Sequence, residues 1–232
     1  MTAASIRSRV RAEMIEEIKA AARRHLAVDG ANLSLRAVAR DMGMVSSALY
    51  RYFPGRDELL TALIIDAYDA MGQAVERADA AVDRADLRGR WLAAAGAVRD
   101  WARANPPEYA LIYGSPVPGY QAPQDTIGPA SRTGIVLIAI LAEGVAGGRL
   151  AVGPDPGDAA DAAGPAGGMA LLVAETFPGL PENILLRGLT AWIQIFGVVS
   201  FELFGQLVNV VKDEPGFFGY QMNRMADLIG LG

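Results

Sequence analysis

The 232-residue chain contains no cysteine and a single histidine, His25. It therefore has no disulfide framework, no thiol nucleophile and no set of zinc ligands, so we predict neither a metal site nor a cofactor. His25 is interpreted as a packing or surface residue. An enzyme would need a nucleophile and a base, or paired carboxylates, that converge in a cleft. Acidic pairs such as Asp57/Glu58 and Asp213/Glu214 fall at expected helix ends instead, which disfavours catalysis.

The chain also lacks an apolar run at its N-terminus, where three glutamates occur by residue 17, so no signal peptide is expected. Its most apolar stretch, Leu189–Phe204, is interrupted by Gln194 and Glu202 and is short for a bilayer span. With 52% hydrophobic residues, the sequence can build a sizeable core in one large domain or two small ones. We expect a soluble, cytoplasmic protein.

Basic residues outnumber acidic ones only in the first quarter of the chain. Residues 1–56 hold ten basic and five acidic residues, whereas residues 57–232 hold eleven basic and twenty-one acidic ones. A basic head on an acidic body would orient the head toward phosphate. Chance variation in surface charge is the alternative interpretation.

The segment Leu33–Leu60, LSLRAVARDMGMVSSALYRYFPGRDELL, predicts three short helical pieces. Ser34 is a helix N-cap ahead of the run Leu35–Asp41, and Gly43 permits a sharp turn. A second helix over about Ser46–Tyr52 is stopped by Pro54-Gly55, and a third begins at Arg56. Two helices joined by a tight glycine turn are typical of a helix-turn-helix, whose second helix enters the major groove of DNA.

This segment resembles the DNA-binding domain of the tetracycline-repressor (TetR) family, through the LSLRAVAR block, the glycine turn and the run ALYRYF-x-x-R-x-E-L-L. The resemblance covers roughly Val10 to Met71. It implies an all-α fold with a helix-turn-helix DNA-binding domain at residues 10–56, the motif itself spanning about residues 34–53. A helical regulatory and dimerisation domain at residues 57–232 would complete an Ω-shaped homodimer.

The resemblance also implies DNA-contacting residues. Ser34 and Arg36 would contact phosphates, which sets register without reading sequence. The expected DNA-binding set comprises Arg7, Ser34, Arg36, Val45, Ser46, Ser47, Tyr50, Arg51, Tyr52 and Arg56, with Ala48 and Leu49 on the packing side. Val45 stands where the family usually has a capping Ser or Thr, and it offers an apolar contact for a thymine methyl instead.

Ahead of the first helix, predicted over residues 9–28, residues 2–8 are interpreted as a polar arm carrying Arg7. Such arms reach phosphates or a minor groove in other DNA-binding proteins. A frayed terminus with solvated arginines is the alternative.

The rest of the chain predicts further helices and two loops. The expected helices cover residues 56–83, 87–105, 108–113, 130–147, 182–211 and 217–229, with an apolar piece at Met169–Phe177. A bend is expected at Asp83–Arg88, a proline- and glycine-rich loop at Gly114–Pro123, and an acidic surface loop at residues 148–165.

The helix over residues 182–211 is apolar nearly all round, so it must be covered on every side. By family resemblance it pairs, together with residues 217–229, with the same two helices of a second subunit. The dimer contacts expected are Leu189, Ile193, Leu203, Phe218, Met222 and Met225. Burial within one subunit is the alternative for one face of the helix.

The body is also similar to a TetR subgroup whose C-terminal domain carries a Trp-His-Gly signature; here the run AWIQIFGVVSFELFG has Phe196 at the histidine position. An apolar small-molecule pocket would then draw on Trp91, Trp101, Tyr109, Tyr113, Trp192, Gln194, Phe196 and Glu202. The aromatic residues among them are more often plain core. The resulting hypothesis is a ligand-released repressor that binds a palindromic operator as a homodimer, and the alternative is a constitutive DNA-binding dimer without a ligand.

Overall fold

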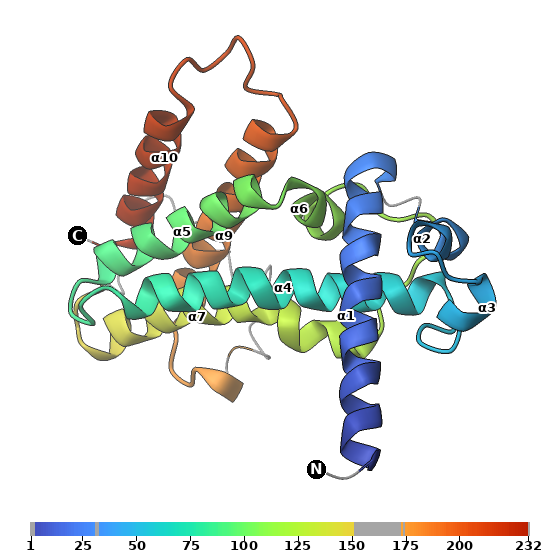
Figure 1. Ribbon diagram of the computed structural model, residues 1–232. Helices are drawn as coiled ribbons and strands as arrows, with labels where there is room; N and C mark the ends of the chain where they lie inside the picture. Colours follow the sequence, from blue (N-terminus) through green and yellow to red (C-terminus); the bar gives the residue numbers. More distant parts are fainter. Residues whose placement is uncertain (1–2, 31–32, 151–172, 174, 232) are drawn as a thin grey trace. The chain divides into compact units, whose positions relative to one another are not determined.

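The computed structural model describes residues 3–30, 33–150, 173 and 175–231, and within these ranges the chain forms helices and no strand. The helices are α1 (Ala3–Asp29), α2 (Leu35–Asp41), α3 (Ser46–Leu49), α4 (Arg56–Ala80), α5 (Leu87–Ala104), α6 (Pro106–Tyr113), the 3-10 helix η1 (Gln124–Thr126), α7 (Ile127–Ala146), α9 (Glu182–Leu203) and α10 (Glu214–Ile229) (Figure 1). The expected all-α class is confirmed.

The chain divides into two compact units. The first lies within Met1–Ala70 and Ala104–Ala130, and the second within Met71–Arg103 and Ser131–Gly232. Helix α4 therefore contributes its first part to one unit and its last part to the other. The functional boundary expected at residue 56 stays a prediction, because compactness does not test it.

In the first unit, α1 packs against α2 and α6, and α2 packs against α3. An apolar stripe on α1 forms its core contact: Ile18, Ala22 and Leu26 are buried, and Met14 is half-buried. They meet the buried residues Leu33, Leu35, Val38, Ala39, Leu49, Phe53, Leu59, Leu60 and Leu63 in one cluster. Burial of this apolar surface holds α1, α2, α3 and the first part of α4 together.

Helix α4 is joined to α1 through Asp66, whose carboxylate accepts hydrogen bonds from two cationic side chains of α1. Lys19 Nζ lies 3.0 Å from Asp66 Oδ1, and Arg23 Nη2 lies 2.5 Å from Oδ2. Burial opposes the charge on Lys19, yet hydrogen bonds to Asp66 and Glu16 outweigh it and raise the pKa of Lys19. Lys19 and Asp66 are 47 positions apart, so no local sequence pattern predicted their contact.

The N-terminus differs from the prediction. Helix α1 begins at Ala3, so residues 3–8 of the expected polar arm form its first turns, and Arg7 is exposed on that helix. The prediction of an arm is wrong because the Ala-Ser-Arg composition of this stretch lets the helix extend outward without a breaker.

In the second unit, α5 carries side chains to two other helices. The fully buried Trp91 donates from its indole nitrogen to the Met222 carbonyl of α10 at 3.0 Å. The guanidinium of Arg99 pairs bidentately with Glu202 of α9, at 2.7 Å from each carboxylate oxygen. Arg99 also lies over the ring of Phe218 in α10, 5.4 Å from its centroid.

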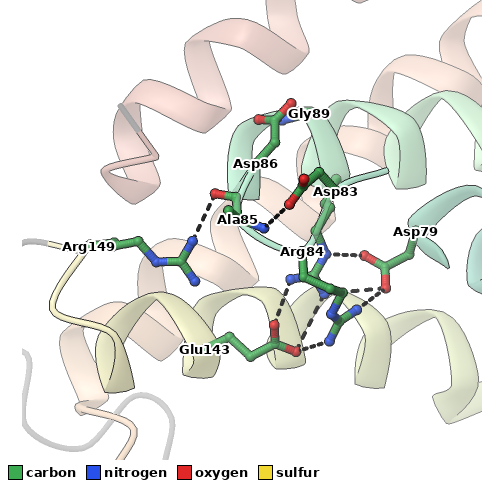
Figure 2. Close-up of polar contacts among 9 residues, drawn as sticks. Asp79, Asp83, Arg84, Ala85, Asp86, Gly89, Glu143 and Arg149 are labelled. Carbon is green, nitrogen blue, oxygen red and sulfur yellow. Dashed lines mark hydrogen bonds and ion pairs between the residues drawn. The ribbon is translucent and has the colours of Figure 1, made fainter. Parts of the chain in front are cut away.

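Ion pairs join the end of α4, the start of α5 and the last turn of α7 (Figure 2). The buried Arg90 donates from Nε to Asp79 Oδ1 and from Nη1 to Glu143 Oε2, each at 2.7 Å. Arg84 contacts the same two carboxylates. The predicted bend connects α4 to α5. At its end, Asp86 Oδ1 accepts a hydrogen bond from the Gly89 amide at 2.7 Å and caps α5.

Two predicted helix ends are displaced. Pro106 and Pro107 were expected only to stop a helix, yet they also open α6, because proline has no amide to lose in a first turn. The helix expected over 182–211 ends at Leu203, since Gly205 adopts a φ of 78° and breaks it. Residues 204–210 continue as turns.

The acidic loop predicted at 148–165 and most of the apolar piece Met169–Phe177 lie outside the described residues. Gln124–Ala146 and Glu182–Leu203 are long and apolar enough to cross a membrane, by length and composition alone. Helix α9 packs against α10 and buries eight residues, as the core helix of a globular unit does.

Candidate nucleic-acid interface

Helix α2 begins as the sequence predicted. Ser34 has extended backbone angles, and its side chain accepts from the Ala37 amide at 3.5 Å, which confirms the N-cap. Leu35, Val38 and Ala39 are buried, so the opposite face of α2 carries Arg36 and Arg40 into solvent. The cap fixes the start of α2 and leaves its basic face exposed.

The turn between α2 and α3 is built on Gly43. Its φ of 66° lies in the left-handed region, which a residue with a side chain enters at a cost. The Met44 amide donates to the Ala39 carbonyl at 2.8 Å and closes the turn. The glycine turn of the predicted helix-turn-helix is confirmed.

Helix α3 is shorter than predicted, covering only Ser46–Leu49 rather than Ser46–Tyr52. Hydrogen-bonded turns continue it, with the Tyr52 and Phe53 amides donating to the Leu49 carbonyl at 2.8 and 3.1 Å. Val45 stands at the N-cap position and makes no side-chain capping bond, as its apolar side chain requires. The loss of a cap and the following Pro54 explain the short regular helix.

Exposure divides the side chains of this segment into two sets. Leu49 is fully buried and holds the segment on the core, as expected of the packing side. Val45 and Tyr50 are 70% and 44% exposed, although both are large and largely apolar. Ser47 and Arg51 are also exposed, whereas Ser46 and Tyr52 are half-buried. The outward set combines an apolar group, hydroxyls and a cation, which are the groups that contact bases and phosphates.

Arg11 of α1, which the DNA-binding prediction omitted, lies against the end of this segment. Its guanidinium stacks over the Tyr52 ring, 5.1 Å from the centroid, and donates to the Arg51 carbonyl at 3.2 Å. The bonded residues are 40 positions apart, so no local pattern signalled the contact.

Arg56 at the start of α4 has a structural bond. Its Nε donates to the Leu33 carbonyl at 3.2 Å, which ties α4 to the residue before the α2 cap. Its side chain is half-buried, so it combines this bond with partial exposure toward solvent. The predicted phosphate contact stays a prediction.

Internal ion pairs divide the basic residues of the first unit. Lys19 and Arg23 are engaged with Asp66, and Arg24 lies 2.9 Å from Asp41. Within the described residues, Arg36, Arg40 and Arg51 form no ion pair, and all three are exposed on or next to the helix-turn-helix. Positive charge that no internal ion pair offsets is therefore available on the motif.

The residues predicted for a ligand pocket fall into both units. Tyr109 and Tyr113 belong to the first unit, where their rings lie 5.2 Å apart and Tyr113 packs edge-on against Tyr68. Burial raises the pKa of the Tyr113 hydroxyl, with Tyr68 and Tyr109 adding to the effect, so it stays neutral.

The other six belong to the second unit. Trp91 is fully buried and bonded to Met222, while Trp101 is half-buried. On α9, Trp192 and Phe196 pack with ring centroids 5.1 Å apart, and Gln194 is half-buried. Glu202 is bound by Arg99 and lies 3.4 Å from Arg103, so protein cations already satisfy its carboxylate, and its contact with a ligand stays a prediction.

The residues predicted for the dimer interface also divide. Phe218 and Met222 are 7% and 1% exposed within the single chain, so they have little surface left for a partner. Ile193 is 55% exposed, and Leu189, Leu203 and Met225 are half-buried. The sequence did not separate these two groups, because an apolar residue such as Phe218 or Met222 can be covered by its own subunit as well as by a partner.

Two sequence profiles match the chain: "Bacterial regulatory proteins, tetR family" over residues 18–63, and "Tetracyclin repressor-like, C-terminal domain" over residues 91–225. The chain is 38% identical over 214 residues to the HTH-type transcriptional regulators Rv1816 of Mycobacterium tuberculosis and Mb1846 of Mycobacterium bovis, covering 90% of this chain and 87% of each relative.

Solved structures give the same picture. The crystal structure of the regulatory protein SCO4313 shares 34% identity and a TM-score of 0.75, with 95% of this chain and 98% of that one covered. PfmR, a TetR family transcriptional regulator from Thermus thermophilus, shares 18% identity and a TM-score of 0.57 over 93% of this chain and 97% of its own. The second likeness bears on the fold alone.

Proposed function

Because the chain belongs to the TetR family of DNA-binding transcriptional regulators, we propose that it acts in the cytoplasm as a homodimeric repressor of a palindromic operator and is released by an apolar small molecule. The family consists of regulators and not of enzymes. Repression is proposed because it is the usual mode of the family.

The observation that carries the proposal is the exposed set on the helix-turn-helix. Val45, Ser47, Tyr50 and Arg51 face solvent while Leu49 anchors the same short segment to the core. Arg36 and Arg40 add positive charge on α2 without an internal ion pair in the described chain. The buried side of this segment fixes its position on the core, and its exposed side presents an apolar group, hydroxyls and a cation. Such an arrangement suits direct contact with base edges.

A stripe along α9, continued by Phe204 just after the end of the helix, supports the homodimer. Ile193, Gly197, Phe201 and Phe204 recur at spacings of four, four and three, and all four are exposed, Ile193 and Phe201 at 55% each. A side chain added at Gly197 would meet nothing within 4 Å, so a neighbouring helix has room to approach there. An exposed aromatic and aliphatic stripe of this kind marks a partner surface, and a second copy is the partner that the family architecture implies.

One buried group in the second unit supports a ligand. The Thr133 side chain on α7 is 2% exposed, and its hydroxyl is the only buried side-chain polar atom in the described ranges without a hydrogen-bond partner. Leaving such a group unpaired costs about 1–3 kcal/mol. A small molecule with one polar group would remove that cost, and Gln194, half-buried on α9, is a second polar group in apolar surroundings.

The reading function can be tested even though the operator sequence is unknown. Purified full-length chain is incubated with a randomised duplex pool, and the bound duplexes are amplified and sequenced over several rounds. We expect inverted half-sites whose centres are about 10 base pairs, or a multiple of that, apart. Failure to bind any duplex at low ionic strength would overturn the proposal.

The ligand is tested on the enriched duplex. A collection of apolar compounds is screened for release of the labelled duplex and for an increase in the melting temperature of the protein. Release accompanied by thermal stabilisation supports the sensor. If no compound changes either quantity while duplex binding persists, the chain is a constitutive DNA-binding dimer.

A further inference from the structure

The turns that follow α3, residues 50–53, are fixed on their inner side by burial of apolar side chains and on their outer side by a polar contact. On the inner side Leu49 and Phe53 are buried, at 0% and 6% exposure. Between them Tyr50, Arg51 and Tyr52 form turns rather than a regular helix, so their backbone has fewer helical bonds to stabilise it. Four residues of regular α3 are too few to fix the direction of these side chains alone.

Arg11 provides a contact on the outer side. Its guanidinium carbon lies 5.1 Å from the centroid of the Tyr52 ring, while Nη2 donates to the Arg51 carbonyl at 3.2 Å. A planar guanidinium can stack on a ring through its face and donate through its edge at the same time. A lysine ammonium lacks the planar, forked geometry, so it cannot make both contacts in the same way.

We propose that Arg11 is a positioning residue for DNA reading: its stack on Tyr52 and its bond to the Arg51 carbonyl hold Tyr50 and Arg51 in the direction that operator contact requires. The inference rests on the proposed function, since it concerns how the helix-turn-helix presents its reading side chains. It adds a residue from α1 to a surface otherwise built by α2, α3 and the turn after α3.

The main alternative is that Arg11 contacts a phosphate directly. The two roles respond differently to lysine, because lysine binds phosphate well as a point charge but cannot reproduce the fork and stack. Arg9→Lys, the same replacement two residues earlier on α1, is the matched control: Arg9 is exposed and pairs only loosely with Glu13, at 3.6 Å.

The first arm measures affinity for the enriched duplex at one fixed salt concentration. Arg11→Ala and Arg11→Lys are both expected to weaken binding about tenfold, since a stacked, charge-assisted contact of this kind is worth on the order of 1–2 kcal/mol. Arg9→Lys should bind like the parent chain. Parent-like binding by Arg11→Lys would overturn the proposal.

A double-mutant cycle on Arg11 and Tyr52 measures the coupling between the two side chains in duplex affinity, which general destabilisation of the fold does not produce. Tyr52→Leu removes the ring that Arg11 stacks on, whereas Tyr52→Phe keeps the ring and removes only the hydroxyl. Once Arg11 is alanine, Tyr52→Leu should cost far less than it does in the parent chain. Additive losses in this cycle count against the proposal.

The second arm needs no DNA. Amide hydrogen exchange of the free protein should quicken at Tyr50–Phe53 in Arg11→Ala and Arg11→Lys, while exchange in α4 and the melting temperature stay as in the parent chain. Unchanged exchange at these amides would overturn the proposal even if no duplex is ever enriched, whereas failure to bind any duplex, by itself, overturns only the proposed function.

Discussion

At the scale of single residues, Leu49 and Tyr50 are neighbours with opposite roles. Leu49 is fully buried and contributes to folding, whereas the Tyr50 side chain is 44% exposed and makes no hydrogen bond within the described chain. Exposure of a large ring lowers stability slightly, so such a position is typical of a binding surface. The two residues let binding and folding be separated by substitution.

Tyr50→Ala is expected to weaken binding to the enriched duplex about tenfold, through loss of ring contacts and of a hydrogen bond from the hydroxyl to phosphate worth on the order of 1–2 kcal/mol together. Tyr50→Phe should lose only the hydroxyl part. The melting temperature should change little, because much of the ring faces solvent. Gel-shift titration at fixed salt measures the affinity, and unchanged binding by the alanine variant would remove Tyr50 from the interface.

The ion pair of Glu76 gives a prediction for how the stability of the protein changes at acidic pH. Its carboxylate accepts from Arg132 Nε at 2.8 Å, and this hydrogen bond is the main reason that the pKa of Glu76 is lowered. A lowered pKa in the folded state means that the ion pair stabilises the protein above the unfolded pKa of about 4.3. The stabilisation is lost as the pH falls through the lower folded value.

Glu76→Gln should therefore cost under about 1 kcal/mol at pH 7, since the carboxylate is partly exposed. The difference in free energy of unfolding between the parent and the variant should shrink as the pH falls below the unfolded pKa of about 4.3. Urea titrations followed by circular dichroism at pH 7, 5 and 3 measure the difference. A gap that widens toward low pH contradicts the assignment.

At the scale of elements, local patterns predicted most helices, and contacts between distant residues decided the rest. Ser34 and Gly43 carry their conformation in their own chemistry, so the cap and the turn were readable from sequence. The lengths of α3 and α9 were not, because a missing cap at Val45 and the left-handed Gly205 compete with periodic patterns.

The candidate site shows the same division. The outward set on the helix-turn-helix was predicted from its place in the motif, whereas the Arg11 contact joins residues 40 positions apart and left no local signal. For the body, periodicity marked Phe218 and Met222 as apolar without telling which surface would cover them. A buried polar group such as Glu202 suggested a ligand because its cationic partner lies 103 positions away.

The Arg99–Glu202 pair links α5 to α9, and its side chains are 9% and 6% exposed. Glu202→Gln would leave the buried Arg99 guanidinium without a counter-charge, which costs about 3 kcal/mol or more. We expect a drop of that size in the free energy of unfolding, measured by urea titration. Arg103→Ala is the control, because that side chain is half exposed and should cost under about 1 kcal/mol. A parent-like stability for Glu202→Gln would support the ligand interpretation of this residue.

At the scale of the whole molecule, charge and apolar surface are segregated along the chain. The basic excess lies in residues 1–56 and the acidic excess in residues 57–232. The largest exposed apolar groups of the second unit gather on α9 and the turns after it, including Phe201, Val208 and Val210. An acidic body repels DNA, so the duplex approaches the basic end, and self-association through the apolar stripe would supply two such ends.

The stripe on α9 gives the prediction that tests assembly. Ile193→Glu places a carboxylate in the middle of the proposed interface, where an unpaired buried charge costs several kcal/mol, and the dimer dissociation constant should rise more than a hundredfold. Sedimentation should then give a monomer at micromolar concentration, with circular dichroism unchanged because the side chain is 55% exposed in the single chain. Ile135→Glu is the matched control, since it makes the same change at a 45% exposed isoleucine of α7, outside the stripe and outside the basic segment. Since a monomer holds one half-site at a time, affinity for the enriched palindrome should fall steeply in the Ile193 variant and stay unchanged in the control. A parent chain that sediments as a monomer, or an Ile193→Glu variant that stays dimeric, would contradict the assembly proposed for this regulator.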